Sequence, residues 1–201
     1  MALEGASIAP YLGDAEAVHR AVTDFLGNGE EPVTGREPPE AGAVHTILFS
    51  DVEGSTSLTE RLGDAKARDV LRTYGRIVRE ALRTRGGSEV KATGDGFMAS
   101  FSSATQALEC AIDIQRAFAA QNESAEEPMR VRIGLNAGEP IEEEEDLFGT
   151  AVNMAARIAD HAGGGEILVA NVVRELAAGK GFLFADRGEV IIRGFEDPVR
   201  L

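Results

Sequence analysis

The chain has 201 residues and a formal net charge of -14 at pH 7, with 43% hydrophobic and 27% charged residues. This composition is typical of a soluble globular protein, and the length favours one main domain. The excess of acidic residues argues against non-specific nucleic-acid binding, which needs clustered Lys and Arg. No apolar run is long enough to cross a membrane and the N-terminus lacks a secretion-signal pattern, so we expect a cytoplasmic protein.

The first part of the chain differs in pattern from the rest. Residues 12–26 place apolar side chains at helical spacing, which predicts an amphipathic helix within residues 1–27. Residues 28–42 are rich in Pro, Gly and Glu and predict a linker. We therefore expect the main domain over residues 43–201. The early helix has no core of its own, so it either docks on the main domain or is the end of a preceding, regulatory domain, and we favour the second.

The order of predicted elements in the main domain indicates an α+β fold. We expect strands over residues 43–50, 89–93, 97–101, 129–137 and 166–170, helices over 64–85, 103–121, 148–161 and 171–178, and a hairpin over 182–195. The first six elements give a βαββαβ order, the ferredoxin-like arrangement, with a C-terminal helix and hairpin added. The expected architecture is an antiparallel-rich sheet flanked by helices. Cys110 lies on an apolar helical pattern within 103–121, which predicts a buried structural thiol.

Two aspartates are candidates for a metal site. Asp51 follows an apolar strand, and Asp95 lies in the "GDG" turn between two strands, 44 positions later. If the strand at 43–50 pairs antiparallel with the strand at 97–101, the two carboxylates converge and repel each other unless a cation neutralises them. Oxygen ligands of this kind suit Mg²⁺ or Mn²⁺. The other interpretation of "DVEGSTS" is ordinary turn and helix-capping chemistry.

A second candidate set lies downstream. Asn153 and Arg157 are four residues apart in the predicted helix over 148–161 and share one helical face. An amide and a guanidinium aligned in this way can reach a sugar and a phosphate, although the same pattern also describes an exposed polar face. Lys91, in the strand over 89–93, is by itself a solvated lysine.

Five stretches together resemble a known family. They are "HTILFSDVEGSTSLTERLGD", "EVKATGDGFMASF", "RVRIGLNAGEP", "DLFGTAVNMAARI" and "DRGEVIIRGFEDPVRL", which run in order through residues 45–201. In this order they resemble the class III nucleotidyl cyclase catalytic domain. The resemblance implies an adenylyl cyclase that converts ATP to cyclic AMP and pyrophosphate.

The resemblance also implies roles for individual residues. Two Mg²⁺ or Mn²⁺ ions per site are expected to bind to Asp51, Asp95 and the backbone carbonyl of Val52. Adenine recognition falls to Lys91, which donates to N1, to Asp146, which accepts from the 6-amino group, and to the small residue Ala156. The triphosphate is expected to contact the following residues: Glu53, Gly54, Ser55, Thr56, Ser57, Arg132 and Arg193.

Asn153 and Arg157 match the residues that stabilise the transition state from the opposite subunit. The resemblance therefore implies a head-to-tail homodimer with two shared sites, and this chain carries both halves of the set. Arg193 stands where the family often has lysine, and Asn136 replaces a frequent histidine. The acidic segment 139–146 occupies the place of the family's dimerisation arm, which leads us to expect a weak or metal-dependent dimer.

Two other functions fit parts of the pattern. A phosphatase of the haloacid dehalogenase type shares the order of Asp51, Lys91 and "GDG", but it needs an aspartate where Glu53 stands and a further acid where Phe97 and Met98 stand. A non-catalytic nucleotide-sensing or dimerisation module of cyclase fold is the second. The complete set of candidate residues favours the enzyme over both.

Overall fold

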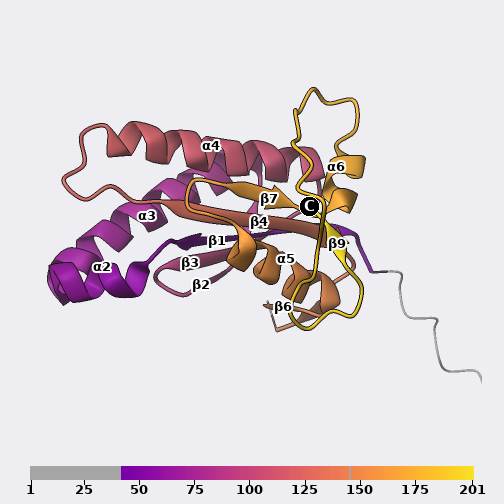
Figure 1. Cartoon of the computed structure of the whole chain (residues 1–201), viewed down its shortest axis with the longest axis horizontal. Helices are drawn as coiled ribbons and strands as arrows, with labels where there is room; N and C mark the ends of the chain where they lie inside the picture. Colours follow the sequence, from indigo (N-terminus) through magenta and orange to yellow (C-terminus); the bar gives the residue numbers. More distant parts are fainter. Residues whose placement is uncertain (1–41, 145) are drawn as a thin grey trace, which may run out of the picture. The chain divides into compact units, whose positions relative to one another are not determined.

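The computed structural model describes residues 42–144 and 146–201. The helix predicted within residues 1–27, and the linker at 28–42 except for its last residue, lie outside the described residues. The centre of the domain is a five-stranded sheet in the order β2-β3-β1-β4-β7 (Figure 1). Its strands are β1 (His45–Val52), β2 (Ser88–Ala92), β3 (Gly96–Phe101), β4 (Val131–Gly138) and β7 (Ile167–Val169). The first four pair antiparallel and β7 runs parallel to β4, which confirms the predicted α+β fold.

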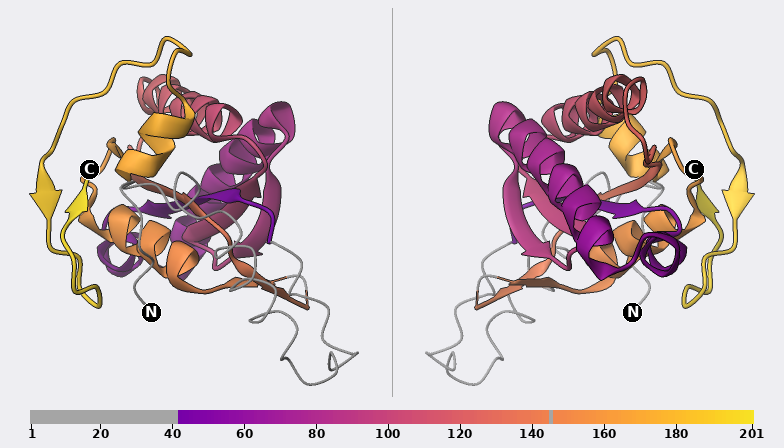
Figure 2. Two further views of the ribbon diagram at one scale, coloured as in Figure 1. Left: turned by 90° about the vertical axis from the view of Figure 1, so that its right-hand side faces the viewer. Right: turned by 90° about the vertical axis from the view of Figure 1, so that its left-hand side faces the viewer.

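Alternation along β1 divides the core between the two faces of the sheet. Leu48 and Val52 pack into a cluster with the apolar stripes of α3 (Asp64–Arg85) and α4 (Ala104–Asn122). Ile47 and Phe49 face the opposite side and pack against α5 (Thr150–His161). Figure 2 shows α3 and α4 together on one face of the sheet and α5 on the other. Because strand side chains alternate, Asp51 belongs to the α5 face.

Helix α5 packs directly on the glycines of β4. A Cβ atom at Gly134 would lie 2.7 Å from the carbonyl oxygen of Ala155 and closer still to the backbone nitrogen of Ala159. At Gly138 it would lie 2.8 Å from the Cβ of Ala151. Small residues on both elements therefore set the depth at which α5 docks.

Two parts of the chain differ from the predicted elements. A short helix, α2 (Ser55–Leu62), precedes α3, and Gly63 at φ 75° separates the two. The predicted hairpin over 182–195 is wrong, because β8 (Glu189–Val190) pairs instead with β9 (Val199–Arg200). The Phe195 N–H donates to the Ile192 carbonyl at 3.0 Å and closes a turn inside the expected second strand.

The remaining elements are α6 (Asn171–Leu176) and a two-stranded hairpin of β5 (Ile141–Glu143) and β6 (Asp146–Phe148). The β5–β6 hairpin holds most of the acidic segment seen in the sequence. Within the part of the chain that the structure describes, no helix combines the length and apolar character needed to cross a membrane.

Candidate active site

The two candidate metal aspartates meet at the end of the central strand. Asp51 pairs with Gly96 in the β1–β3 register, so Asp95 in the preceding turn lies beside it. The Val52 N–H donates to the Asp95 carbonyl oxygen at 3.0 Å and fixes the turn to the strand. The antiparallel pairing thus brings together two residues 44 positions apart, as the predicted topology requires.

The charge at this point is partly balanced from β4. Arg132 lies opposite Asp51 in the β1–β4 register, and its Nη2 donates to Asp51 Oδ2. Partial burial raises the pKa of Asp51, with Asp95 adding to the rise and the Arg132 guanidinium opposing it. On the other carboxylate, Ser55 Oγ donates to Asp95 Oδ2 at 2.6 Å. Asp51 is therefore desolvated and held by one cation, while Asp95 is held by a hydroxyl.

A cavity of about 190 Å³ joins these carboxylates to other predicted residues. Asp51, Asp95, Lys91 and Ala156 all line it, and so does Asp160, which sequence reasoning missed. The walls come from β1, β2, the turn before β3 and the face of α5 that packs on the sheet. We refer to it below as the Asp51–Asp95 cavity.

The predicted purine residues form a pair beside this cavity. Lys91 Nζ donates to Asp146 Oδ2 at 2.8 Å, from β2 to the first residue of β6. Asp146 Oδ1 also accepts the Leu147 N–H at 2.9 Å. These two bonds lower the pKa of Asp146, with the lysine the larger cause. The site thus presents a cation and an ionised acceptor side by side.

The loop after β1 forms a helix N-terminus. Gly54 has φ 68°, a left-handed conformation that glycine accepts readily, and α2 begins at the next residue. Its first intrahelical bond is Leu58 N–H to the Gly54 carbonyl, so the N–H groups of Ser55, Thr56 and Ser57 precede the hydrogen-bonded turns. Such a terminus favours an anion.

Glu53 does not point into this loop. Its N–H donates to the Arg130 carbonyl at 2.8 Å, and its Oε1 accepts the Gly164 N–H at 3.0 Å. Both polar groups are thus used by segments distant in sequence. Sequence reasoning placed Glu53 with the phosphate-binding residues and had no signal for these contacts.

Three predicted residues lie away from the aspartates. Asn153 and Arg157 are exposed on α5, as their spacing predicts, and neither lines the Asp51–Asp95 cavity. Arg157 Nη1 donates to Asp160 Oδ2 at 3.1 Å. Arg193 is exposed in the C-terminal segment and also lies outside the lining of the cavity. One copy of the chain therefore does not assemble the whole predicted set.

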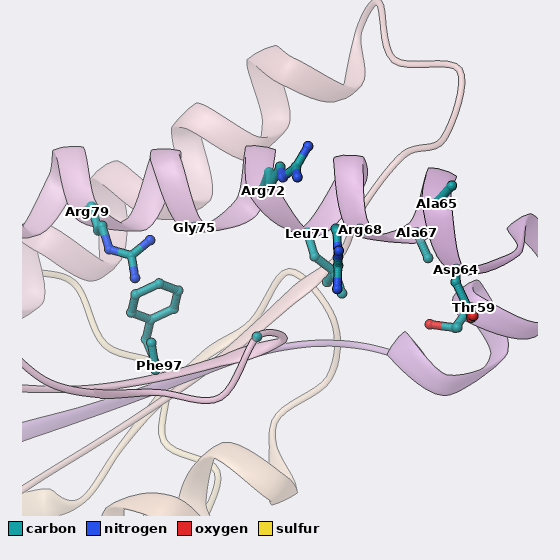
Figure 3. A pocket seen from close by; sticks show the side chains of 12 residues that line it. Thr59, Asp64, Ala65, Ala67, Arg68, Leu71, Arg72, Gly75, Arg79 and Phe97 are labelled. Atoms are coloured by element: carbon teal, nitrogen blue, oxygen red, sulfur yellow. The ribbon is translucent and has the colours of Figure 1, made fainter.

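A larger cavity, of about 880 Å³, lies on the other side of the β2–β3 turn (Figure 3). It runs along α3, where Arg68 points into it beside Leu71, and Arg79 lies over the ring of Phe97 at 4.8 Å from the centroid. Neither Asp51 nor Asp95 lines it. Size alone would thus have pointed away from the paired carboxylates.

The sheet order and the paired carboxylates agree with the class to which the sequence motifs pointed, the class III nucleotidyl cyclases. The family model of the adenylate and guanylate cyclase catalytic domain matches residues 38–200. The chain therefore belongs to this family.

Individual relatives agree with the family assignment. The chain is 32% identical over 158 residues to a putative adenylate cyclase 3 of Rhizobium meliloti, covering 77% of this chain and 27% of that protein. It is 32% identical over 160 residues to an adenylate cyclase of Podospora anserina, covering 67% of this chain and 7% of the relative. The chain thus spans about a quarter of the first relative and less than a tenth of the second.

Among solved structures, an adenylate/guanylate cyclase/hydrolase from Silicibacter pomeroyi superposes with a TM-score of 0.72 at 34% identity. The match covers 78% of this chain and 93% of that one. The predicted fold and the predicted family are both confirmed.

Proposed function

We propose that the protein is an adenylyl cyclase that converts ATP to 3',5'-cyclic AMP and pyrophosphate at two sites shared across a head-to-tail homodimer. The observation that carries the proposal is the division of the site residues. Asp51, Asp95 and Lys91 line one cavity, whereas Asn153 and Arg157 face outward from α5. A second copy that brings its α5 to this cavity would complete the set.

The residues at the cavity fit a divalent cation. Two carboxylates and a backbone carbonyl are hard oxygen ligands. The pKa of Asp51 is raised because the carboxylate is partly buried and the nearby positive charge does not offset that burial, so a further cation would be accommodated there. We assign Asp51, Asp95 and the Val52 carbonyl to Mg²⁺ or Mn²⁺. Bound there, two ions would supply Lewis acidity to the ribose 3'-hydroxyl and to the triphosphate.

Arg132 is the stand-in cation of this site. Its guanidinium already neutralises the Asp51 carboxylate. Both side chains are partly buried, with exposed fractions of 25% for Arg132 and 34% for Asp51. With Asp51 neutralised by a divalent ion, this guanidinium would be free to contact the triphosphate. The proposed role of Arg132 in phosphate binding is therefore compatible with its present partner.

The rest of the triphosphate contacts come from α2. The N–H groups of Ser55, Thr56 and Ser57 and the left-handed Gly54 allow close approach of phosphate oxygens. Ser55 also holds Asp95 through its hydroxyl, which couples the phosphate loop to the carboxylate. We assign Arg193, which is exposed in the C-terminal segment, to the terminal phosphates.

The Lys91–Asp146 pair supports adenine over guanine. The lysine can donate to adenine N1, and the carboxylate, ionised because its pKa is lowered, can accept from the 6-amino group. Guanine presents a donor at N1 and an acceptor at position 6, so both contacts would become unfavourable. Ala156 is small enough to leave the cavity open beside them.

Asn153 and Arg157 are assigned to the transition state. The amide would orient the ribose and the guanidinium would balance charge that develops on the α-phosphate, contributions that typically reach about 3 to 4 kcal/mol per group. The alternative function is a nucleotide-sensing or dimerisation module without chemistry. The presence of both aspartates and both α5 residues favours catalysis.

The deciding experiment offers ATP and GTP separately to the purified chain with Mn²⁺ and then Mg²⁺, and identifies the product by chromatography. Cyclic AMP from ATP is the expected product. Cyclic GMP as the main product would overturn the purine assignment, and metal-dependent nucleotide binding without any cyclic product would favour the sensing module. Sedimentation with and without metal tests the dimer, which we expect to strengthen when metal and nucleotide are present.

A further inference from the structure

Three distant segments are joined by one group of contacts, which we call the Glu53 clamp and define by Glu53, Arg130 and Gly164. Glu53 Oε1 accepts the Gly164 N–H at 3.0 Å. Arg130 donates to the Gly164 carbonyl oxygen from Nη2 at 2.6 Å and from Nε at 3.1 Å. The Glu53 N–H donates to the Arg130 carbonyl at 2.8 Å and closes the ring of contacts. Both backbone polar groups of Gly164 are thus held by side chains.

The fit at Gly164 leaves no space for a side chain. A Cβ atom there would lie 2.7 Å from Arg130 Cβ and 2.7 Å from the Glu53 carboxyl carbon. Its neighbour Gly163 differs, because the nearest atom to a Cβ atom there is Glu166 Oε2 at 3.7 Å, an ordinary contact. Neither glycine is among those with positive φ, so the difference between the two positions is steric.

The clamp connects two functional parts of the chain. Glu53 lies between Val52, at the end of the strand that carries Asp51, and Gly54, where α2 begins. Gly164 follows Ala162, the C-terminal cap of α5, and α5 carries Asn153 and Arg157. The clamp therefore fixes the end of α5 to the loop beside the Asp51–Asp95 cavity.

We propose that Glu53 and Arg130 are positioning residues that make the metal and phosphate loop move as one unit with α5. This inference rests on the proposed function, in which α5 serves the cavity of the partner copy. Glu53 then acts on two sites: its own cavity through the loop, and the partner's cavity through Asn153 and Arg157. Occupancy of one site of the dimer would be transmitted to the other.

Hydrogen exchange on the full chain tests the clamp without relying on activity. We expect Glu53→Ala to raise amide exchange at Gly164 and through the last turn of α5. The matched control is Glu127→Ala, which removes another surface ion pair, Arg61 Nη1 to Glu127 Oε2 at 2.6 Å, that also ties α2 to the segment before β4. Wild-type exchange over residues 157–165 in Glu53→Ala would overturn the inference.

A second pair of variants tests the clamp at the glycines instead of at Glu53. Gly164→Ala should push the Glu53 carboxylate out of place and reproduce the exchange pattern of Glu53→Ala. Gly163→Ala should match the wild type, because it meets no close atom. Equal behaviour of the two alanine variants would overturn the steric part of the inference.

Complementation separates the two effects of Glu53. An Asp95→Asn chain mixed with an Arg157→Ala chain should regain about a quarter of the wild-type rate, because random pairing leaves half of the dimers with one complete site. Adding Glu53→Ala to the Asp95→Asn chain alters only the chain that lends its α5 to that site. We expect the regained rate to fall about tenfold, as for a small displacement of reacting groups.

The outcomes are distinguishable. An undiminished rate with Glu53→Ala on the Asp95→Asn chain would overturn the inference and leave the proposed function intact. Failure of the two single-variant chains to complement, with an active wild type, would instead overturn the shared site, and hydrogen exchange would then decide the clamp alone. Glu127→Ala on the same chain should not change the regained rate.

Discussion

The two halves of the proposed site differ in how far one chain completes them. Asp51 and Asp95 lie in a cavity and already hold Arg132 and Ser55, so their side chains are preorganised. Asn153 and Arg157 lie on the outer face of α5, where Asp160 accepts a hydrogen bond from the guanidinium. In the proposed homodimer, the fold of one chain builds the first half, and the second half serves the site of the partner. If the proposal holds, a chain can fold fully and still be catalytically incomplete.

The largest loss of activity is expected from a change in the metal-binding half, which contains Asp51 and Asp95. Asp95→Asn keeps an oxygen for the Ser55 hydroxyl but removes the negative charge that a divalent ion needs. Cyclase activity should fall about 10³-fold, while circular dichroism and the melting temperature stay close to wild type. Activity near wild type would refute the metal assignment.

In the half formed by Asn153 and Arg157, Arg157→Ala should lower turnover about 10²-fold. Because Arg157 does not line the cavity of its own chain, Mn²⁺ affinity measured by calorimetry should be unchanged. A loss of Mn²⁺ affinity as large as the loss of turnover would show that Arg157 contributes to the metal-binding half, so that the two halves are not separate.

Base selection should depend on the pair beside the cavity. Lys91→Glu combined with Asp146→Gly should change the ratio of kcat/KM for ATP and GTP by at least about 100-fold in favour of GTP, because two hydrogen bonds to charged groups are each worth about 1.5 to 3 kcal/mol. Lys66→Gln, on the exposed face of α3, changes the net charge by the same amount and supplies the charge control. An unchanged ratio would remove Lys91 and Asp146 from purine recognition.

The docking of α5 links the halves mechanically and can be tested through stability. Gly134→Ala would force a methyl group against the backbone of Ala155 and Ala159. We expect a loss of about 1 to 3 kcal/mol in unfolding free energy, measured in urea, because the helix must move off the sheet. A variant as stable as wild type would show that α5 can shift without cost.

The smallest effect concerns the core shared by α3 and α4. Burial raises the pKa of Cys110 to about 12, so at pH 8 only about one folded chain in 10⁴ carries the thiolate. Alkylation should therefore report unfolding alone. Since the unfolded thiol ionises near its ordinary pKa and the folded one does not, stability should fall as pH rises above 9. Cys110→Ala should weaken that dependence near pH 9, below the range in which Tyr74, whose pKa burial also raises, ionises in the unfolded chain. Rapid alkylation of the native chain would contradict the assignment.

Much of this arrangement was predictable because it follows from local pattern and topology. A short apolar run indicated β1, and the βαββαβ order favoured its antiparallel pairing with β3, which brings Asp51 to Asp95. The contacts that were missed depend on register between distant segments. Arg132 meets Asp51 because of the β1–β4 alignment, and Glu53 meets Gly164 across 111 positions.

The C-terminal error has the same origin. Residues 182–185 form a short apolar run typical of a strand, but nothing local indicates that the pairing partner of Glu189–Val190 lies beyond Pro198. The break between α2 and α3 was also missed, since only the left-handed Gly63 separates two continuous helical patterns.

Strand β1 has one further consequence. Leu48, Ser50 and Val52 face the α3–α4 core while Ile47, Phe49 and Asp51 face α5, so the position of Asp51 depends on a count of residues rather than on any one of them. Inserting or deleting a single residue in β1 would turn the aspartate into the apolar core and turn Val52 toward the cavity. The strand can accept changes of side chain far more readily than any change of length.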